Sequence, residues 1–213
     1  MKRYRILHVP FFCLVLLAIT TPANASLIVN GSFESTTGGS DYGKPDGWVV
    51  SNTAGKSYGN PKAFKRPAAV PPASGSWALD LGPTGIDVDN GGSISQTFSV
   101  SAPGPYAFSF DYTNEENHAS KLADFSWSLT GAVTDGATLS DVGGGYQNFS
   151  KSYVVSSSGD VTVSFQDIIS GQVNDAVIDD VSFVRLPEPS SCVLFLIGML
   201  GLGFRRRRPN HPA

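Results

Sequence analysis

Four segments of the chain place an apolar residue at every second position, with mostly small polar residues between them. Successive side chains of a strand point to opposite faces, so this period predicts strands with one buried and one solvated face. The apolar positions are Tyr106, Phe108 and Phe110, then Phe125, Trp127 and Leu129, then Val161, Val163 and Phe165, and finally Val177, Val181 and Phe183.

Five further segments favour strands, and residues typical of turns separate them. They are residues 27–30, 47–51, 77–81, 93–100 and 146–155. A long loop is expected between residues 51 and 76, which hold four prolines. About nine or ten short strands with glycine-rich turns predict an all-β fold, an antiparallel β-sandwich, and we expect the jelly-roll form.

The first 25 residues have the layout of a secretory signal peptide. Three basic residues among the first five precede an apolar core at residues 9–19, and Ala23-Asn24-Ala25 forms a small-x-small cleavage site. We therefore expect a signal helix over residues 1–25 and a mature chain that begins near Ser26.

The body of the chain, from Ser26 to Leu186, has 161 residues, which is enough for one domain with its own core. The two cysteines, Cys13 and Cys192, lie outside the body, so it has no disulfide and no thiol nucleophile. Seventeen acidic and eight basic residues give the body a net charge of −9. A surface of that sign repels nucleic acid, and we expect no nucleic-acid partner.

The last 27 residues combine a proline-flanked glutamate, an apolar run at residues 190–204 and an arginine cluster. A helix of fifteen residues is ~23 Å long against a hydrocarbon core of ~30 Å, which predicts a short transmembrane helix with its arginines in the cytoplasm. The body would then lie outside, with the prolines as a hinge that a protease can reach. The residues concerned are Pro187, Glu188, Pro189, Arg205, Arg206, Arg207 and Arg208.

This order of parts resembles the PEP-CTERM sorting signal of Gram-negative bacteria. The resemblance implies that an exosortase-type enzyme of the inner membrane recognises and processes residues 187–213, and that the body reaches the cell surface or the extracellular matrix. One departure is that Pro209 to Ala213 follow the arginines, where such signals usually stop. The alternative is an ordinary membrane anchor that is not processed.

Two short segments at opposite ends of the body can meet if the first and last strands are neighbours. They are residues 30–34 (NGSFE) and 178–183 (IDDVSF). Strand parity turns Asp179 inward with the apolar residues that follow it, and a buried carboxylate needs a partner. Because calcium takes six to eight oxygens, we predict calcium ligands at Ser32, Glu34 and Asp179. The alternative is that Glu34 caps a turn and Asp179 accepts backbone N–H bonds.

The same segments resemble the galactose-binding-like jelly rolls of family 4 and 22 carbohydrate-binding modules and of choice-of-anchor surface domains. The matching elements are residues 30–34, Gly47-Trp48, 92–98, 104–111 and 178–182, in that order. The resemblance implies the jelly-roll fold, and such domains often hold a structural calcium between the first and last segments.

A glycan site needs exposed aromatic side chains. Trp77 and Trp127 share parity with apolar neighbours and are expected in the core. The resemblance implies that Trp48, in the Gly-Trp element, is a lid over the core. The remaining candidates for stacking on sugar are Tyr42, Tyr58 and Tyr112. The solvated serine and threonine faces can also hydrogen-bond a polysaccharide, as any solvated sheet can.

Catalytic motifs are weak in this sequence. The body has one histidine, His118, and neither a Gly-x-Ser-x-Gly elbow nor a zinc-spaced histidine pair. Glu115 and Glu116 are adjacent, which points them to opposite faces of a strand. We therefore expect an exported, non-enzymatic protein with an adhesion or polysaccharide-association role. The alternatives are a lectin with a defined glycan specificity and a glycan-active hydrolase.

Overall fold

The computed structural model describes residues 25–37, 42–52, 62–65, 72–81, 92–114, 123–141, 145–168 and 176–187. The strands of this part are β1 (Thr36–Thr37), β2 (Tyr42–Pro45), β3 (Val49–Asn52), β4 (Lys62–Lys65), β5 (Trp77–Asp80), β6 (Gly92–Val100), β7 (Gly104–Asn114), β8 (Ala123–Gly131), β9 (Asp135–Asp141), β10 (Gln147–Val155), β11 (Gly159–Asp167) and β12 (Ala176–Arg185). All strand pairs are antiparallel.

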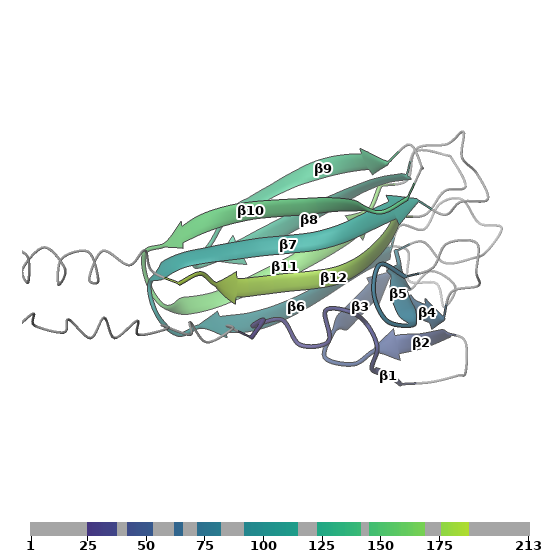
Figure 1. Ribbon diagram of the computed structural model, residues 1–213, viewed down its shortest axis with the longest axis horizontal. Coiled ribbons are helices and arrows are strands. Elements are labelled where there is room, and N and C mark those ends of the chain that lie inside the picture. Colours follow the sequence, from purple (N-terminus) through teal and green to yellow (C-terminus); the bar gives the residue numbers. More distant parts are fainter. Residues whose placement is uncertain are drawn as a thin grey trace, which may run out of the picture.

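Two sheets pack face to face as a β-sandwich (Figure 1). The seven-stranded sheet has the order β1-β2-β4-β5-β12-β7-β10, and the five-stranded sheet has the order β3-β6-β11-β8-β9. The all-β antiparallel sandwich expected from the alternating pattern is confirmed.

The core lies between the two sheets and is built from the alternating apolar positions. Phe108, Phe110, Phe165 and Phe183 are completely buried, and Trp127 is 3% exposed. The ring of Phe110 lies 5.0 Å from that of Phe165, so the two sheets interdigitate through their aromatic side chains. Trp48 and Trp127 are core residues as predicted, while Trp77 is partly buried and packs against the core.

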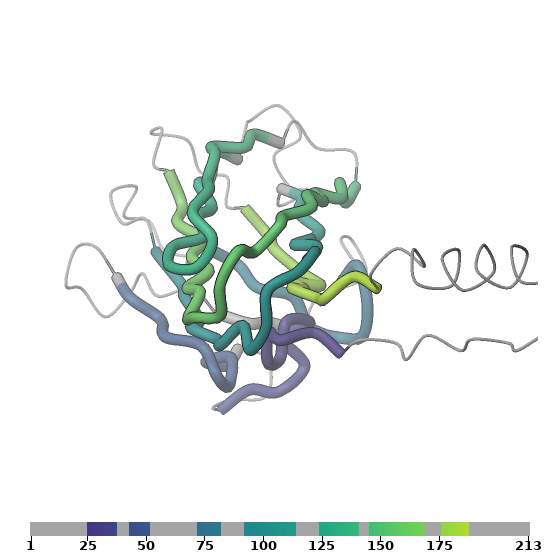
Figure 2. The backbone as a smooth tube through the Cα atoms, turned by 90° about the vertical axis from the view of Figure 1, so that its left-hand side faces the viewer, coloured from purple at the N-terminus to yellow at the C-terminus, as the bar shows by residue number. Residues whose placement is uncertain are grey.

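The first and last described segments lie side by side, as the sequence predicted for the two ends of the body (Figure 2). The backbone N–H of Leu27 donates to the carbonyl of Phe183 at 2.8 Å, and that of Val181 donates to the carbonyl of Gly31 at 2.9 Å. Both ends of the described chain therefore leave the same end of the sandwich (Figure 1).

Five elements differ from the expectation, and two of them are the short strands β1 and β2, which the sequence did not predict. Residues 27–30 form turns and no strand, because Asn30 (φ 52°) and Phe33 (φ 57°) adopt left-handed backbone conformations. Within the predicted loop of residues 51–76, Lys62–Lys65 form β4. The edge strand β9 was missed because its sequence, DGATLSD, carries only weak alternation.

The inward orientation predicted for Asp179 is wrong, although its burial is correct. Asp179 pairs with Asp111, whose side chain lies on the outer face of β7, whereas Ile178 and Phe183 belong to the core between the sheets. A register shift between Asp179 and Ser182 changes the parity, and the left-handed Asp180 (φ 49°) lies within it. Counting by two from Phe183 therefore assigns Asp179 to the wrong face.

Candidate functional site

The NGSFE segment joins the start of the body to its last strand. A Cβ on Gly31 would lie 1.9 Å from the carbonyl oxygen of Val181, so only glycine permits this close approach. The side-chain amide of Asn30 donates to the carbonyls of Ser35 at 2.7 Å and Asp46 at 3.1 Å. These contacts give the motif a structural role.

The Gly47-Trp48 element packs on the contact between the NGSFE segment and β12, which we call the joint. The indole Nε1 of Trp48 donates to the carbonyl of Asn30 at 3.1 Å, and the Trp48 ring lies 5.4 Å from the completely buried Phe33. Gln96 closes the joint from β6, since its amide donates to the carbonyls of Val29 and Gly47. The NGSFE segment, the Gly47-Trp48 element and residues 92–98 are thus in physical contact.

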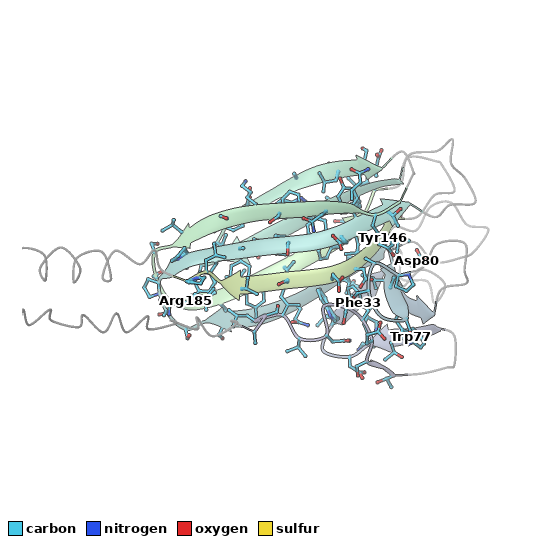
Figure 3. All side chains as sticks on the ribbon, viewed as in Figure 1. Phe33, Trp77, Asp80, Tyr146 and Arg185 are labelled. Carbon is cyan, nitrogen blue, oxygen red and sulfur yellow. The ribbon has the colours of Figure 1, made fainter. Side chains whose placement is uncertain are left out.

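Two carboxylates from opposite ends of the body hold the turn before β5. Oε1 of Glu34 accepts the backbone N–H groups of Ser76 at 2.7 Å and Trp77 at 2.9 Å. Oδ2 of Asp179 accepts the N–H of Ser74 at 3.2 Å, and its Oδ1 accepts that of Asp180 at 2.8 Å. Figure 3 shows Phe33 and Trp77, which flank this turn, in one region of the sandwich.

Burial dominates the electrostatics of Asp179. Its side chain is completely buried, and loss of solvation raises the pKa of Asp179 to about 7. The charge of Asp180 adds a smaller increase, and the backbone N–H bonds, which stabilise the carboxylate form, oppose the increase. The ion pair between Lys151 and Asp135 does not involve Asp179. Asp179 is therefore a carboxyl that a proton or a cation would stabilise.

Backbone N–H groups donate to both Glu34 and Asp179. This arrangement is the one expected from the alternative to calcium binding, in which Glu34 caps a turn and Asp179 accepts backbone N–H bonds. Across the described ranges, no group of three His, Cys, Asp or Glu side chains is placed to hold a metal. A carboxylate oxygen has a second lone pair, so Glu34 and Asp179 can still face an ion. The six to eight oxygens that calcium takes would have to be completed by carbonyl groups, such as that of Ser32, and by water.

The prediction that Tyr112 is exposed and stacks on sugar is wrong. Tyr112 is 8% exposed and points into the core, where its ring lies 5.3 Å from Phe125 and its hydroxyl donates to Gln147 at 3.0 Å. Tyr112 follows the period-two pattern of β7 and so belongs with the buried positions. Tyr42 begins β2 but its side chain is outside the described set, as is all of Tyr58. Among the aromatic side chains that the structure describes, which exclude those of Tyr42 and Phe64, none is exposed.

The outer face of the five-stranded sheet carries hydroxyl side chains in register, and we call it the hydroxyl face. Ser164 on β11 lies between Ser95 of β6 and Ser128 of β8. The next row joins Thr162 to Thr97 and Thr130 in the same way. The members of the hydroxyl face are Ser51, Ser93, Ser95, Thr97, Ser99, Ser126, Ser128, Thr130, Thr138, Ser140, Thr162 and Ser164.

The two outer faces of the sandwich differ in charge. On the hydroxyl face, the acidic residues Asp124 and Asp160 lie at opposite ends of the strands, so the middle rows carry no charge. On the seven-stranded sheet, Asp111 of β7 is directly opposite Asp179 of β12, which is buried beneath the Ser74 turn. The sequence showed the alternating serines but not that five strands align them into one surface.

The predicted sorting residues fall almost entirely outside the described ranges. Pro187 is the last described residue and is exposed, whereas Glu188, Pro189 and the four arginines from Arg205 to Arg208 lie beyond it, as does the span of residues 190–204. The described part of the chain contains no helix that is long and apolar enough to cross a membrane.

No protein-family model matches this sequence, and a search of curated proteins finds no match. Solved structures do share the fold. A family 61 carbohydrate-binding module in complex with β-1,4-galactotriose has a TM-score of 0.54 and 17% identity, over 76% of this chain and 99% of that one. This likeness shows that the body has a jelly-roll β-sandwich fold.

Proteins with other activities share the same sandwich. A cyclase from Fischerella sp., in its apo form, has a TM-score of 0.57 and 11% identity, over 77% of this chain and 97% of that one. The enzymatically active domain of tailspike protein 4 from bacteriophage CBA120 has a TM-score of 0.52 and 13% identity, over 76% of this chain but only 21% of that one. The fold is shared by binding modules and enzymes, so the site has to decide the function.

Proposed function

We propose that this protein is an exported, non-catalytic β-sandwich that associates with polysaccharide through its hydroxyl face. The observation that carries the proposal is the uncharged middle of that face on a body whose net charge is −9. A neutral, hydroxyl-rich surface suits a neutral, hydroxyl-rich polymer. The shared fold of a module that binds β-1,4-galactotriose supports this proposal.

The chemistry of the face suits many weak contacts. Each serine or threonine hydroxyl is both a donor and an acceptor, as are the hydroxyls of a sugar. Hydroxyl groups on neighbouring strands are ~4.8 Å apart, and hydroxyl groups two residues apart on the same strand are ~6.7 Å apart. The result is a regular array of hydrogen-bonding groups. Without an aromatic platform each contact is weak, so affinity for a long chain depends on the number of contacts made together.

Co-sedimentation with insoluble polysaccharides tests this proposal. The described strands and core all lie within residues 25–187, so a chain of residues 26–187 contains the whole fold. Ser164→Glu puts a charge in the middle of the hydroxyl face, and we expect it to weaken binding by about tenfold or more. Ser109→Glu is the matched control on the outer face of β7. Equal binding by both variants would refute the role of the hydroxyl face.

The second candidate is a lectin that recognises a defined glycan by stacking. It depends on Tyr42 and Tyr58, because Tyr112 is in the core. A glycan array distinguishes the two. Selective binding that is lost on Tyr58→Ala and kept in Ser164→Glu would favour the lectin.

Non-catalytic status is part of the proposal. Burial raises the pKa of Asp179, but this carboxyl is completely buried beneath the Ser74 turn, out of reach of a substrate. A glycan-active hydrolase remains the alternative. Release of reducing ends from the bound polysaccharide would establish that alternative.

We also propose that an exosortase-type enzyme processes the chain and delivers the body to the cell surface or matrix. The N–H of Leu186 donates to the carbonyl of Pro105 at 2.8 Å, so the folded body extends to Leu186, and Pro187, the last described residue, is exposed. Mass spectrometry of the surface-associated protein should find a chain that lacks Arg205 to Arg208. An intact cluster would show an anchor that is not processed.

A further inference from the structure

The sandwich has four strands that pair on one side only, and three of them are poor templates for another strand. β1, β3, β9 and β10 end the two sheet orders. β1 has two residues and β3 has four, which is too short for a stable added strand. β9 carries an aspartate at each end and Gly136 near its start, which oppose pairing.

β10 lacks these protective features. It pairs with β7 over all nine of its residues without a register shift, and it contains neither proline nor glycine (Figure 1). Eight of its nine side chains are exposed or partly exposed, and Val154 is 86% exposed. A long, regular and accessible edge of this kind is a template for strand addition.

The single charge of β10 is already neutralised. Nζ of Lys151 lies 2.6 Å from Oδ2 of Asp135, which also accepts the hydroxyl of Tyr153. The Lys151 and Tyr153 bonds hold the pKa of Asp135 below its usual value, so Asp135 stays ionised at neutral pH. Lys151 is therefore less able to repel an approaching strand than a free edge lysine is.

We propose that β10 pairs antiparallel with β10 of a second copy of this chain, about a twofold axis at Ser152, so that the two seven-stranded sheets become continuous. Self-pairing needs a strand whose two halves complement each other. An axis at Lys151 would set the two lysines directly opposite, which is destabilising. An axis at Ser152 sets each Lys151 opposite Tyr153 of the second copy.

The same register sets uncharged residues opposite each other on either side of the central positions. Phe149 comes opposite Val155 of the second copy, and this aromatic–aliphatic pair stabilises the neighbouring strands. The exposed Val154 comes opposite Ser150. The contact is smaller than the ~800 Å² per partner of a standard interface, so we expect a weak dimer with a dissociation constant of about 10–100 μM.

Disulfide trapping tests the register. The body has no cysteine, so one introduced thiol is a unique reporter. Ser152→Cys puts two thiols at the axis, where opposed Cβ atoms are ~5 Å apart, and we expect a covalent dimer under mild oxidation. Ser150→Cys is an equally exposed control whose thiols would be ~13 Å apart. Equal trapping of the two variants, or of neither, overturns the proposed pairing.

Sedimentation equilibrium tests the edge without a new covalent bond. For residues 26–187, we expect Val154→Lys to raise the dimer dissociation constant at least tenfold and to leave the unfolding midpoint unchanged, because Val154 is exposed. Val49→Lys is the matched control on the edge strand β3, where valine is 64% exposed, and we expect no change. A monomer up to about 500 μM, or a dimer that Val154→Lys does not weaken, contradicts the proposal.

Discussion

The buried carboxyl of Asp179 predicts that the body is more stable at pH 5 than at pH 8. Burial raises the pKa of Asp179 to about 7, from 3.8 in the unfolded chain. The folded protein therefore holds this proton more tightly than the unfolded chain does. The resulting stabilisation is fully present below about pH 4 and is lost as the pH rises through 7.

The size of this effect follows from the two pKa values. Between pH 5 and pH 8 the free energy of unfolding should fall by about 2.5 kcal/mol, and the melting temperature by about 5–10 °C for a domain of this size. Asp46 and Asp135 do not contribute in this range. Hydrogen bonds from Ser35 to Asp46 and from Lys151 to Asp135 lower their pKa values, so their contributions are lost only in acid.

Urea denaturation of residues 26–187 in EDTA, at pH 5 and pH 8, measures the effect. Asp179→Asn keeps the shape of the side chain and cannot ionise, so its pH dependence should be smaller than that of the wild type by about 2.5 kcal/mol. The comparison removes the contribution of every other titrating group. Parallel pH profiles for the wild type and Asp179→Asn would refute the assignment of a buried, ionising carboxyl.

Three further changes test the joint, the core and the metal. Gly31→Ala should lower the free energy of unfolding by about 3 kcal/mol, because its Cβ would meet a carbonyl oxygen at 1.9 Å. Gly145→Ala is the control, since nothing lies within 4 Å of its added Cβ and only its left-handed backbone opposes the change. Phe110→Ala should cost about 3–5 kcal/mol in the same urea assay, and a loss below 1 kcal/mol would contradict its central place in the core. We propose that calcium at pH 8 adds about 1–3 kcal/mol through Asp179, measured as a higher melting point that EDTA and Asp179→Asn both abolish; an unchanged midpoint would leave the backbone N–H bonds as the whole account.

The strands and the meeting of the two ends were predictable because they depend on local patterns. Phe108, Phe165 and Phe183 belong to period-two segments whose buried face can be read directly, and their burial follows. The contact between residues 30–34 and 178–183 required one further assumption, that the first and last strands are neighbours. The bond between Val181 and Gly31 confirms that the two segments meet, although residues 27–30 form turns and are not a first strand.

The face occupied by Asp179 was not predictable by counting. The register shift in β12 arises where Val181 bonds to Gly31, so it depends on a segment distant in sequence. Tyr112 was assigned to solvent although its period agrees with Phe110, which shows that the strand pattern was a better guide than the expectation that a tyrosine is exposed. The hydroxyl face needed the order β3-β6-β11-β8-β9, which no local pattern contains.

Polysaccharide association through the hydroxyl face is tested most directly by NMR. Soluble oligosaccharide is titrated into ¹⁵N-labelled residues 26–187, and the amide signals of the two outer faces are compared. We expect concentration-dependent shifts at Ser95, Ser128 and Ser164, and none at Ser109 on the opposite sheet. Shifts that spare the hydroxyl face while oligosaccharide binds elsewhere would contradict the account.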